Sequence, residues 1–172
     1  RSIMGKSILC FALGLMAQEF GQIAYSYYIY VMHVEVPFPS IGDIGYFGSI
    51  PLYILGVVYL ARASGVKVST ASLNNKLWAF VIPLFMLSVS YFLFLKNYTL
   101  NLMDPLATFL NFGYPMGQAI YISVAILTYL LSRNVLGGIM KDKILFILFA
   151  LLIQYLSDYT FLYQVNNETW KT

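Results

Sequence analysis

The chain has 172 residues, of which 60% are hydrophobic and 10% are charged, and its mean hydropathy is +0.75. Because soluble domains carry about 25% charged residues, this composition excludes a water-soluble globular domain and predicts a polytopic membrane protein. Cys10 is the single cysteine of the sequence, which excludes an internal disulfide and a thiolate metal site.

The apolar residues come in long blocks, and five blocks approach the roughly 20 residues that a helix needs to cross the hydrocarbon core. In chain order, the predicted spans are residues 8–32, 44–61, 77–95, 114–131 and 144–163. The sequence therefore predicts an all-α bundle, with residues 1–172 forming one transmembrane helical domain. Since the chain begins with Arg1 and ends in a polar stretch, we interpret it as part of a longer protein.

A short segment before the fourth span is expected to form a separate element. Asp104 and Pro105 have the pattern of a helix start, with a capping residue followed by a first-turn proline. Gly113 and Pro115 follow, and we expect them to break the helix. Residues 104–112 are thus predicted to be a short helix lying at the outer interface.

The basic residues indicate an orientation in the membrane. Eight of the ten lie before the first span, between the second and third, or between the fourth and fifth: Arg1, Lys6, Arg62, Lys67, Lys76, Arg133, Lys141 and Lys143. Loops rich in Lys and Arg stay in the cytoplasm, which predicts a cell-membrane protein with a cytoplasmic N-terminus and an extracytoplasmic end to this segment. The net charge of +3 then reflects topology rather than a nucleic-acid partner.

Polar side chains recur at one depth, the predicted outer half, in four of the five spans. We select as candidate ligand-binding residues Glu19, Gln22, Tyr25, Asp43, Tyr46, Tyr114, Gln118, Tyr121, Gln154 and Asp158. An ionisable group near the bilayer midplane costs at least a few kcal/mol unless it is paired or wetted. These groups should therefore turn inward, toward an outward-facing polar cavity lined by tyrosines.

Glu19 and Asp158 are the stronger candidates in this set, because a carboxylate is a costly way to hold helices together. Glu19 should face the bundle interior, within reach of Gln118, Asp158 or a neighbouring tyrosine. The alternative is that the tyrosines form an interfacial aromatic belt and the Gln and Asp residues link helices by hydrogen bonds.

Four motifs resemble a known family in the same order along the chain. They are the acidic and aromatic "AQEFGQIAYSYY", the loop and span "FPSIGDIGYFGSIPLYILGVVYL", the Tyr-Pro span "YPMGQAIYISVAILTYLL" and the closing "YLSDYTFLYQ". The pattern is similar to the multi-span membrane sensory region that precedes bacterial and archaeal diguanylate cyclase and histidine kinase domains. The resemblance matches Glu19, Asp43 and Asp158 to acidic positions, departs at Gln118 where an acid is expected, and implies a further span on each side.

The sequence has no H-E-x-x-H motif, no nucleophile elbow and only one histidine, so we do not expect an enzyme. It indicates no particular cofactor. The favoured interpretation is a sensory or receptor-like bundle in the lipid bilayer that signals to a cytoplasmic partner. Two alternatives stay open: an integral subunit of a larger membrane complex, and a small transporter or channel.

Overall fold

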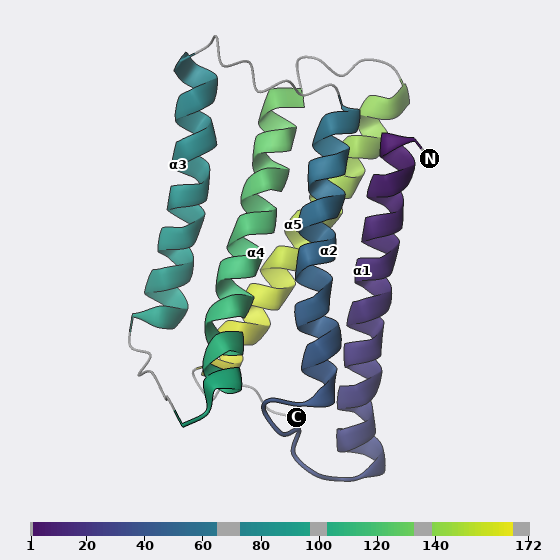
Figure 1. Cartoon of the computed structure of the whole chain (residues 1–172), viewed down its shortest axis with the longest axis vertical. Coiled ribbons are helices and arrows are strands. Elements are labelled where there is room, and N and C mark those ends of the chain that lie inside the picture. The colour runs from purple at the N-terminus through teal and green to yellow at the C-terminus, as the bar shows by residue number, and fades with distance from the viewer. Residues whose placement is uncertain (1, 65–72, 97–102, 133–138, 167–172) are drawn as a thin grey trace.

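The computed structural model describes residues 2–64, 73–96, 103–132 and 139–166, and the described chain is a bundle of helices (Figure 1). The helices are α1 (Ile3–Ser26), α2 (Ile41–Ala63), α3 (Leu73–Ser90), α4 (Pro105–Ser132) and α5 (Ile139–Asn166). A π-helical turn extends α1 over Tyr27–Val31, and another extends α3 over Tyr91–Leu95. No strand occurs within the described ranges, which confirms the expected all-α architecture.

Within the described residues, five helices are long and apolar enough to cross a membrane, as the sequence predicted. These candidate spans are Ile3–Val31, Ile41–Ala63, Leu77–Leu95, Pro105–Leu131 and Asp142–Gln164. The first, second and fourth begin several residues before the predicted blocks. In each case the helix includes small or polar residues that lower the local hydropathy without ending the backbone hydrogen bonding.

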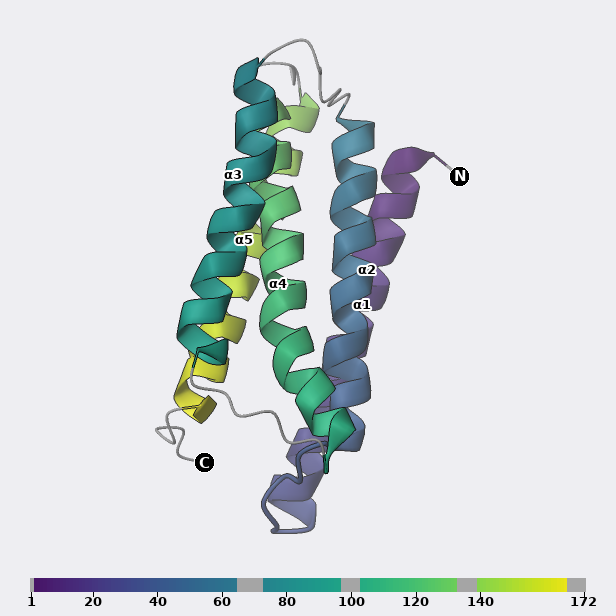
Figure 2. The ribbon, with the colours of Figure 1, turned by 60° about the vertical axis from the view of Figure 1, so that its left-hand side comes forward.

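The prediction of a separate interfacial helix over residues 104–112 is wrong, because α4 continues from Pro105 to Ser132. Its start is as expected, since the Ala107 N–H donates to the Asp104 carboxylate over 3.0 Å. Proline is tolerated inside membrane helices. Next to it, the Tyr159 hydroxyl donates to the Pro115 carbonyl over 2.9 Å, which joins α5 to α4 at this point. Figure 2 shows α4 bending near its N-terminal end instead of breaking.

Gly113 is explained by packing rather than by a chain break. A Cβ at this position would lie 2.5 Å from the Phe47 ring of α2. The glycine therefore lets an aromatic side chain of α2 approach the backbone of α4. Gly113, which we expected to end a helix, instead lies within α4 at its contact with α2.

The helix ends that flank residues 65–72 and 133–138 all lie at one end of the bundle, together with the N-terminus of α1 (Figure 1). This confirms that the helix ends joined by the two basic connections lie at the same end of the bundle, which we call the basic end. Among the described residues, Lys6, Arg62 and Lys143 belong to it. Which side of a membrane the basic end faces stays the prediction of the charge rule.

Small residues bring α1 and α2 into close contact. The buried residues of α1 are Ser7, Gly14 and Gly21, spaced seven residues apart. A Cβ on Gly14 would lie 2.7 Å from the Tyr53 ring, and one on Gly21 would lie 2.8 Å from the Tyr46 ring. Membrane helices gain little from burying apolar surface against each other, so such close contacts supply much of their association.

The helix α4 lies at the centre of the bundle and contacts α2, α3 and α5. Its buried residues, including Ala119, Ile122 and Ala125, pack in one core cluster with residues of α2 and α5. The helix α5 is oblique: it runs from the side of α1 and α2 at the basic end to a position behind α4 at the other end (Figures 1 and 2). Its main contacts are with α4 and with the turn that follows α3.

Replacing Gly45 by alanine should weaken the contact between α1 and α2. The new methyl group would meet the Ala17 carbonyl oxygen and would lie 2.8 Å from the Gly21 nitrogen. We expect the free energy of unfolding to fall by about 1–3 kcal/mol, the usual cost of overpacking, when the purified chain in mild detergent is titrated with SDS. Gly48→Ala is the matched control, because nothing lies within 4 Å of a Cβ there. Equal losses for both variants would contradict the close contact.

Candidate functional site

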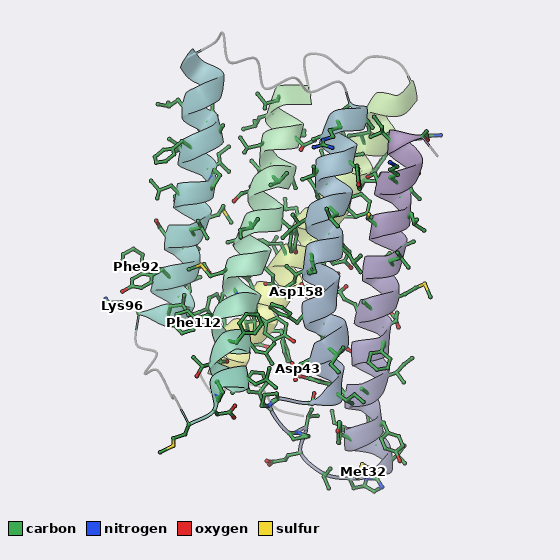
Figure 3. All side chains as sticks on the ribbon, in the orientation of Figure 1. Met32, Asp43, Phe92, Lys96, Phe112 and Asp158 are labelled. Carbon is green, nitrogen blue, oxygen red and sulfur yellow. The ribbon has the colours of Figure 1, made fainter. Side chains whose placement is uncertain are left out.

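Polar side chains from α1, α2, α4 and α5 gather in two clusters. The Asp43 cluster consists of Tyr25, Ser40, Asp43 and Tyr114, and the Asp158 cluster consists of Gln118, Tyr121, Gln154 and Asp158. Figure 3 places Asp43 near the N-terminal end of α2 and Asp158 on α5, closer to the middle of the bundle.

The Asp43 carboxylate is almost completely hydrogen-bonded by the chain itself. Its Oδ2 accepts from the Ser40 N–H at 2.7 Å and the Ser40 hydroxyl at 2.9 Å, and its Oδ1 accepts from the hydroxyls of Tyr114 at 2.7 Å and Tyr25 at 3.3 Å. A carboxylate offers about four lone-pair sites. Asp43, which is only 4% exposed, therefore closes the first turn of α2 and ties α1 and α4 to it.

The Asp158 carboxylate is less fully satisfied. The side-chain amide of Gln118 donates to its Oδ2 over 3.1 Å, and that of Gln154 donates to its Oδ1 over 2.8 Å. No lysine, arginine or histidine side chain of the described residues forms an ion pair with it. The negative charge is thus held by neutral dipoles alone.

Two buried polar atoms in the Asp158 cluster have no hydrogen-bond partner among the described residues. They are Oε1 of Gln118, a residue that is 5% exposed, and the hydroxyl of Tyr121, a residue that is 1% exposed. Leaving such a group unpaired costs about 1–3 kcal/mol. Both residues lie on α4, one turn apart. They add two open hydrogen-bonding positions to the cluster.

Aromatic rings surround the Asp158 cluster. The Tyr121 ring centroid is 5.8 Å from that of Tyr53 and 6.4 Å from that of Tyr155, which in turn is 4.2 Å from Tyr159. The Tyr53 hydroxyl donates to Gln18 Oε1 over 2.7 Å. We did not select Tyr53, Tyr155 or Gln18 from the sequence. The seven-residue spacing of Tyr46 and Tyr53, matching that of Gly14 and Gly21, was the available signal.

A crevice of about 410 Å³ adjoins the cluster between α1 and α5. It is lined by Ile8, Phe11, Ala12, Leu15, Tyr53, Ile147, Ala150, Leu151 and Gln154. Gln154 belongs to both the crevice wall and the Asp158 cluster, so the crevice meets the cluster at this side chain, whereas Gln118, Tyr121 and Asp158 do not line it. Apart from Gln154 and the Tyr53 hydroxyl, its walls are apolar.

The crevice does not lie where the outward-facing cavity is expected, and that cavity stays a prediction. Its α1 residues belong to the N-terminal half of that helix, and its α5 residues to the N-terminal half and middle of that helix. The crevice therefore lies between the polar cluster and the basic end, and it faces sideways between two helices. The oblique path of α5 explains this, because α1 and α5 flank one space only in that half of the bundle.

The expectation that Glu19 faces the interior is wrong for this chain. Its side chain is exposed, and no hydrogen bond among the described residues includes it. The neighbouring apolar residues Met16 and Ile23 are 68% and 67% exposed. Among the described residues, α2 is the helix that packs extensively against α1, and α5 lies behind α4 toward this end of the bundle (Figure 1). The Tyr46 hydroxyl is an electrostatic neighbour of the Glu19 carboxylate.

The ten candidate residues thus divide into separate groups. The structure unites Tyr25, Asp43 and Tyr114 in one cluster, and Gln118, Tyr121, Gln154 and Asp158 in the other. Gln22 and Tyr46 form a third, exposed contact, in which the Tyr46 hydroxyl donates to Gln22 Oε1 over 2.7 Å. Ligand binding by any of them stays a prediction.

No family model, curated protein or solved structure matches the chain, so the resemblance to membrane sensory regions stays a prediction from the motifs. Among the described residues, no group of three or more His, Cys, Asp and Glu side chains could hold a metal ion. What the Asp158 cluster offers chemically is a negative charge, open acceptors and aromatic faces beside an apolar crevice. These features suit binding.

Replacing Asp43 by alanine should destabilise the bundle strongly, because the buried Tyr114 hydroxyl and the Ser40 N–H would both lose their acceptor. We expect a loss of at least about 2 kcal/mol in the free energy of unfolding, measured by SDS titration in mild detergent. Asp104→Ala is the control, since its carboxylate accepts one capping hydrogen bond at the start of α4 and should cost about 1 kcal/mol. A loss no larger for Asp43→Ala would refute the interhelical role.

Proposed function

We propose that the chain is a membrane-embedded sensory, receptor-like bundle that binds a ligand beside Asp158 and signals to a cytoplasmic partner. The observation that supports this most directly is the crevice between α1 and α5, whose wall includes Gln154, a hydrogen-bond donor to the half-buried Asp158 carboxylate. Because the crevice opens sideways, the ligand reaches it from the bilayer. The motif resemblance to sensory regions is in agreement with this function.

The way α5 is held supports an output by helix movement. This helix contacts α4 and the turn after α3, and it faces α1 across the crevice. The pair of α1 and α2, in contrast, is closely packed along its length through its glycines. A ligand between α1 and α5 would therefore bias the position of α5 more than that of α1. Small helix shifts of this kind are a common means of signalling.

The distribution of polar groups argues against the transporter alternative. Transport requires a polar path to both ends of the bundle, whereas the crevice toward the basic end is lined mainly by apolar side chains such as Ile8, Phe11 and Ile147. The polar clusters lie at mid-depth and toward the opposite end. This arrangement suits a binding site with one entrance.

A second candidate function, a subunit of a larger membrane complex, is favoured by Glu19. Met16, Glu19 and Ile23 occupy one face of α1 and are exposed on this chain. In a bilayer, an uncovered carboxylate in the middle of a span costs at least a few kcal/mol. Contact with another polypeptide at this face would remove that cost, and it is compatible with a sensory role.

Filling the crevice by mutation tests the sensory proposal. We expect Ala150→Trp to occupy the crevice and move α5 away from α1, because Ala150 lines it. Spin labels on Ile3→Cys and Lys143→Cys, both exposed near the basic end, report the separation in lipid nanodiscs, with Cys10→Ser as background. The mean label distance should increase by a few ångströms, of the order of known helix shifts.

Leu152→Trp is the matched control for the filled crevice, because Leu152 is on α5 but does not line the crevice. It should leave the label distance at the wild-type value. If the mean distance between the two spin labels is the same in Ala150→Trp, in Leu152→Trp and in the protein without either substitution, coupling between this crevice and the basic end is refuted.

Cross-linking tests the second candidate function. Ile23→Cys, placed beside Glu19 in the Cys10→Ser background, should form an intermolecular disulfide in native membranes under mild oxidation. Phe85→Cys on α3 is the control, since Phe85 is 63% exposed and Ile23 is 67% exposed. Reaction at Ile23 at least several-fold above that at Phe85 is expected. Equal reaction at both positions would remove the support for an interface at Glu19.

A further inference from the structure

We infer that the ligand of the Asp158 cluster is an organic ammonium ion, with its charged group at Asp158 and its apolar part in the crevice between α1 and α5. The inference deepens the proposed sensory function and rests on its ligand-binding site. It is carried by the chemistry of four features: the Asp158 charge, the open polar atoms of Gln118 and Tyr121, the aromatic rings, and an apolar crevice that touches this cluster at Gln154.

Asp158 supplies the negative charge of the site. Among the described residues, its half-buried carboxylate accepts hydrogen bonds from the neutral side-chain amides of Gln118 and Gln154, each of which donates to a different oxygen. Removing a carboxylate from water is expensive unless a counter-charge and hydrogen bonds compensate it. Each oxygen retains an open lone pair. A cationic ligand would supply the counter-charge that the described residues lack.

The open acceptors favour an ammonium group among cations. Gln118 Oε1 and the Tyr121 hydroxyl are buried and unpartnered, and Tyr121 is an electrostatic neighbour of Asp158. A primary ammonium carries three N–H donors. It therefore has one donor for each of Asp158, Gln118 and Tyr121, whereas an alcohol has a single donor and no charge.

The rings and the crevice favour an organic cation over an alkali ion. The ring centroids of Tyr53, Tyr121 and Tyr155 lie within 6.4 Å of their neighbours beside the cluster, and aromatic faces attract ammonium groups. The crevice of about 410 Å³ has the volume of a small-molecule site. Its apolar walls would cover a hydrocarbon or phenyl group, for which Na⁺ has no equivalent.

Asp43 provides an internal contrast. It is more deeply buried than Asp158, and four donors of the chain fill its oxygens. None of its cluster lines the crevice. The same reasoning therefore selects Asp158 and rejects Asp43 as the cation partner.

The test compares two ligands of nearly equal shape on the full chain in phosphatidylcholine nanodiscs. Phenethylammonium carries the charge and three donors, and phenethyl alcohol is its neutral counterpart. Binding is measured by isothermal titration calorimetry, and by the rise in unfolding temperature that a ligand specific for the folded state produces. We expect the ammonium to bind at least about tenfold more tightly than the alcohol, a difference of about 1.4 kcal/mol.

Substitutions locate the site. Asp158→Asn keeps the shape and removes the charge, and it should abolish the tenfold preference. Tyr121→Phe keeps the ring and removes the open hydroxyl, and it should weaken ammonium binding several-fold. Asp142→Asn is the matched control, because it removes an exposed carboxylate at the first turn of the same helix, and it should bind both ligands as the wild type does.

Equal binding of the two ligands by the wild type would overturn the inference, whether or not Asp158→Asn folds. Undiminished ammonium preference in Asp158→Asn, or saturable stabilisation by NaCl that phenethylammonium does not exceed, would overturn it too. The spin-label distance separates this result from the sensory proposal. Preferential ammonium binding without a change in that distance would support the ligand class and refute signalling by α5. A distance change in Ala150→Trp without ammonium preference would do the reverse.

Discussion

The contact of α1 with α2 through glycine is the constraint on which the rest of the bundle depends. Gly14 and Gly21 leave space for the rings of Tyr53 and Tyr46, and Gly45 meets the α1 backbone directly. Because the rings lie over glycines, their hydroxyls reach Gln18 and Gln22 on α1. Packing and hydrogen bonding between helices replace the hydrophobic effect as the source of association in lipid. The wall of the crevice is thus built from the same contacts that join the first two helices.

Asp43, which is buried, and Asp158, which is half-buried, demonstrate how local donors decide what a carboxylate can do. Asp43 stands at the N-terminal turn of α2, where a backbone N–H and the Ser40 hydroxyl are close by, and two tyrosines complete its hydrogen bonding. Asp158 stands inside α5, where the backbone N–H groups are already used by the helix. It must rely on side chains from a neighbouring turn and a neighbouring helix. All the oxygen lone pairs of Asp43 are therefore used by hydrogen bonds within the chain, whereas each oxygen of Asp158 retains an open lone pair.

Hydropathy and charge predicted the spans, the shared end of the basic connections and the depth of the polar residues, because each of these is a property of one helix at a time. The meeting of Gln118, Gln154 and Asp158 followed from depth as well. The continuity of α4 and the exposure of Glu19 could not be predicted in this way. Both depend on contacts between helices. The Phe47 ring of α2 packs against Gly113 of α4, and α5 does not cover Glu19 on α1. The seven-residue spacing of Gly14 and Gly21 is the feature of the sequence that indicates the α1–α2 contact.

The oblique path of α5 has two consequences with one cause. At the basic end this helix faces α1 across the crevice, and toward the other end it lies behind α4 (Figures 1 and 3). The crossing therefore opens the crevice on the basic-end side of Asp158 and leaves Glu19 uncovered on the other side. A rotation of α5 toward α1 would narrow the crevice and at the same time bring polar groups nearer to Glu19. A position of α5 that covers Glu19 would therefore leave less room in the crevice, and a position that keeps the crevice open would leave Glu19 uncovered. In the proposed function, this competition would give the bundle two arrangements, and a ligand or a neighbouring subunit would select between them.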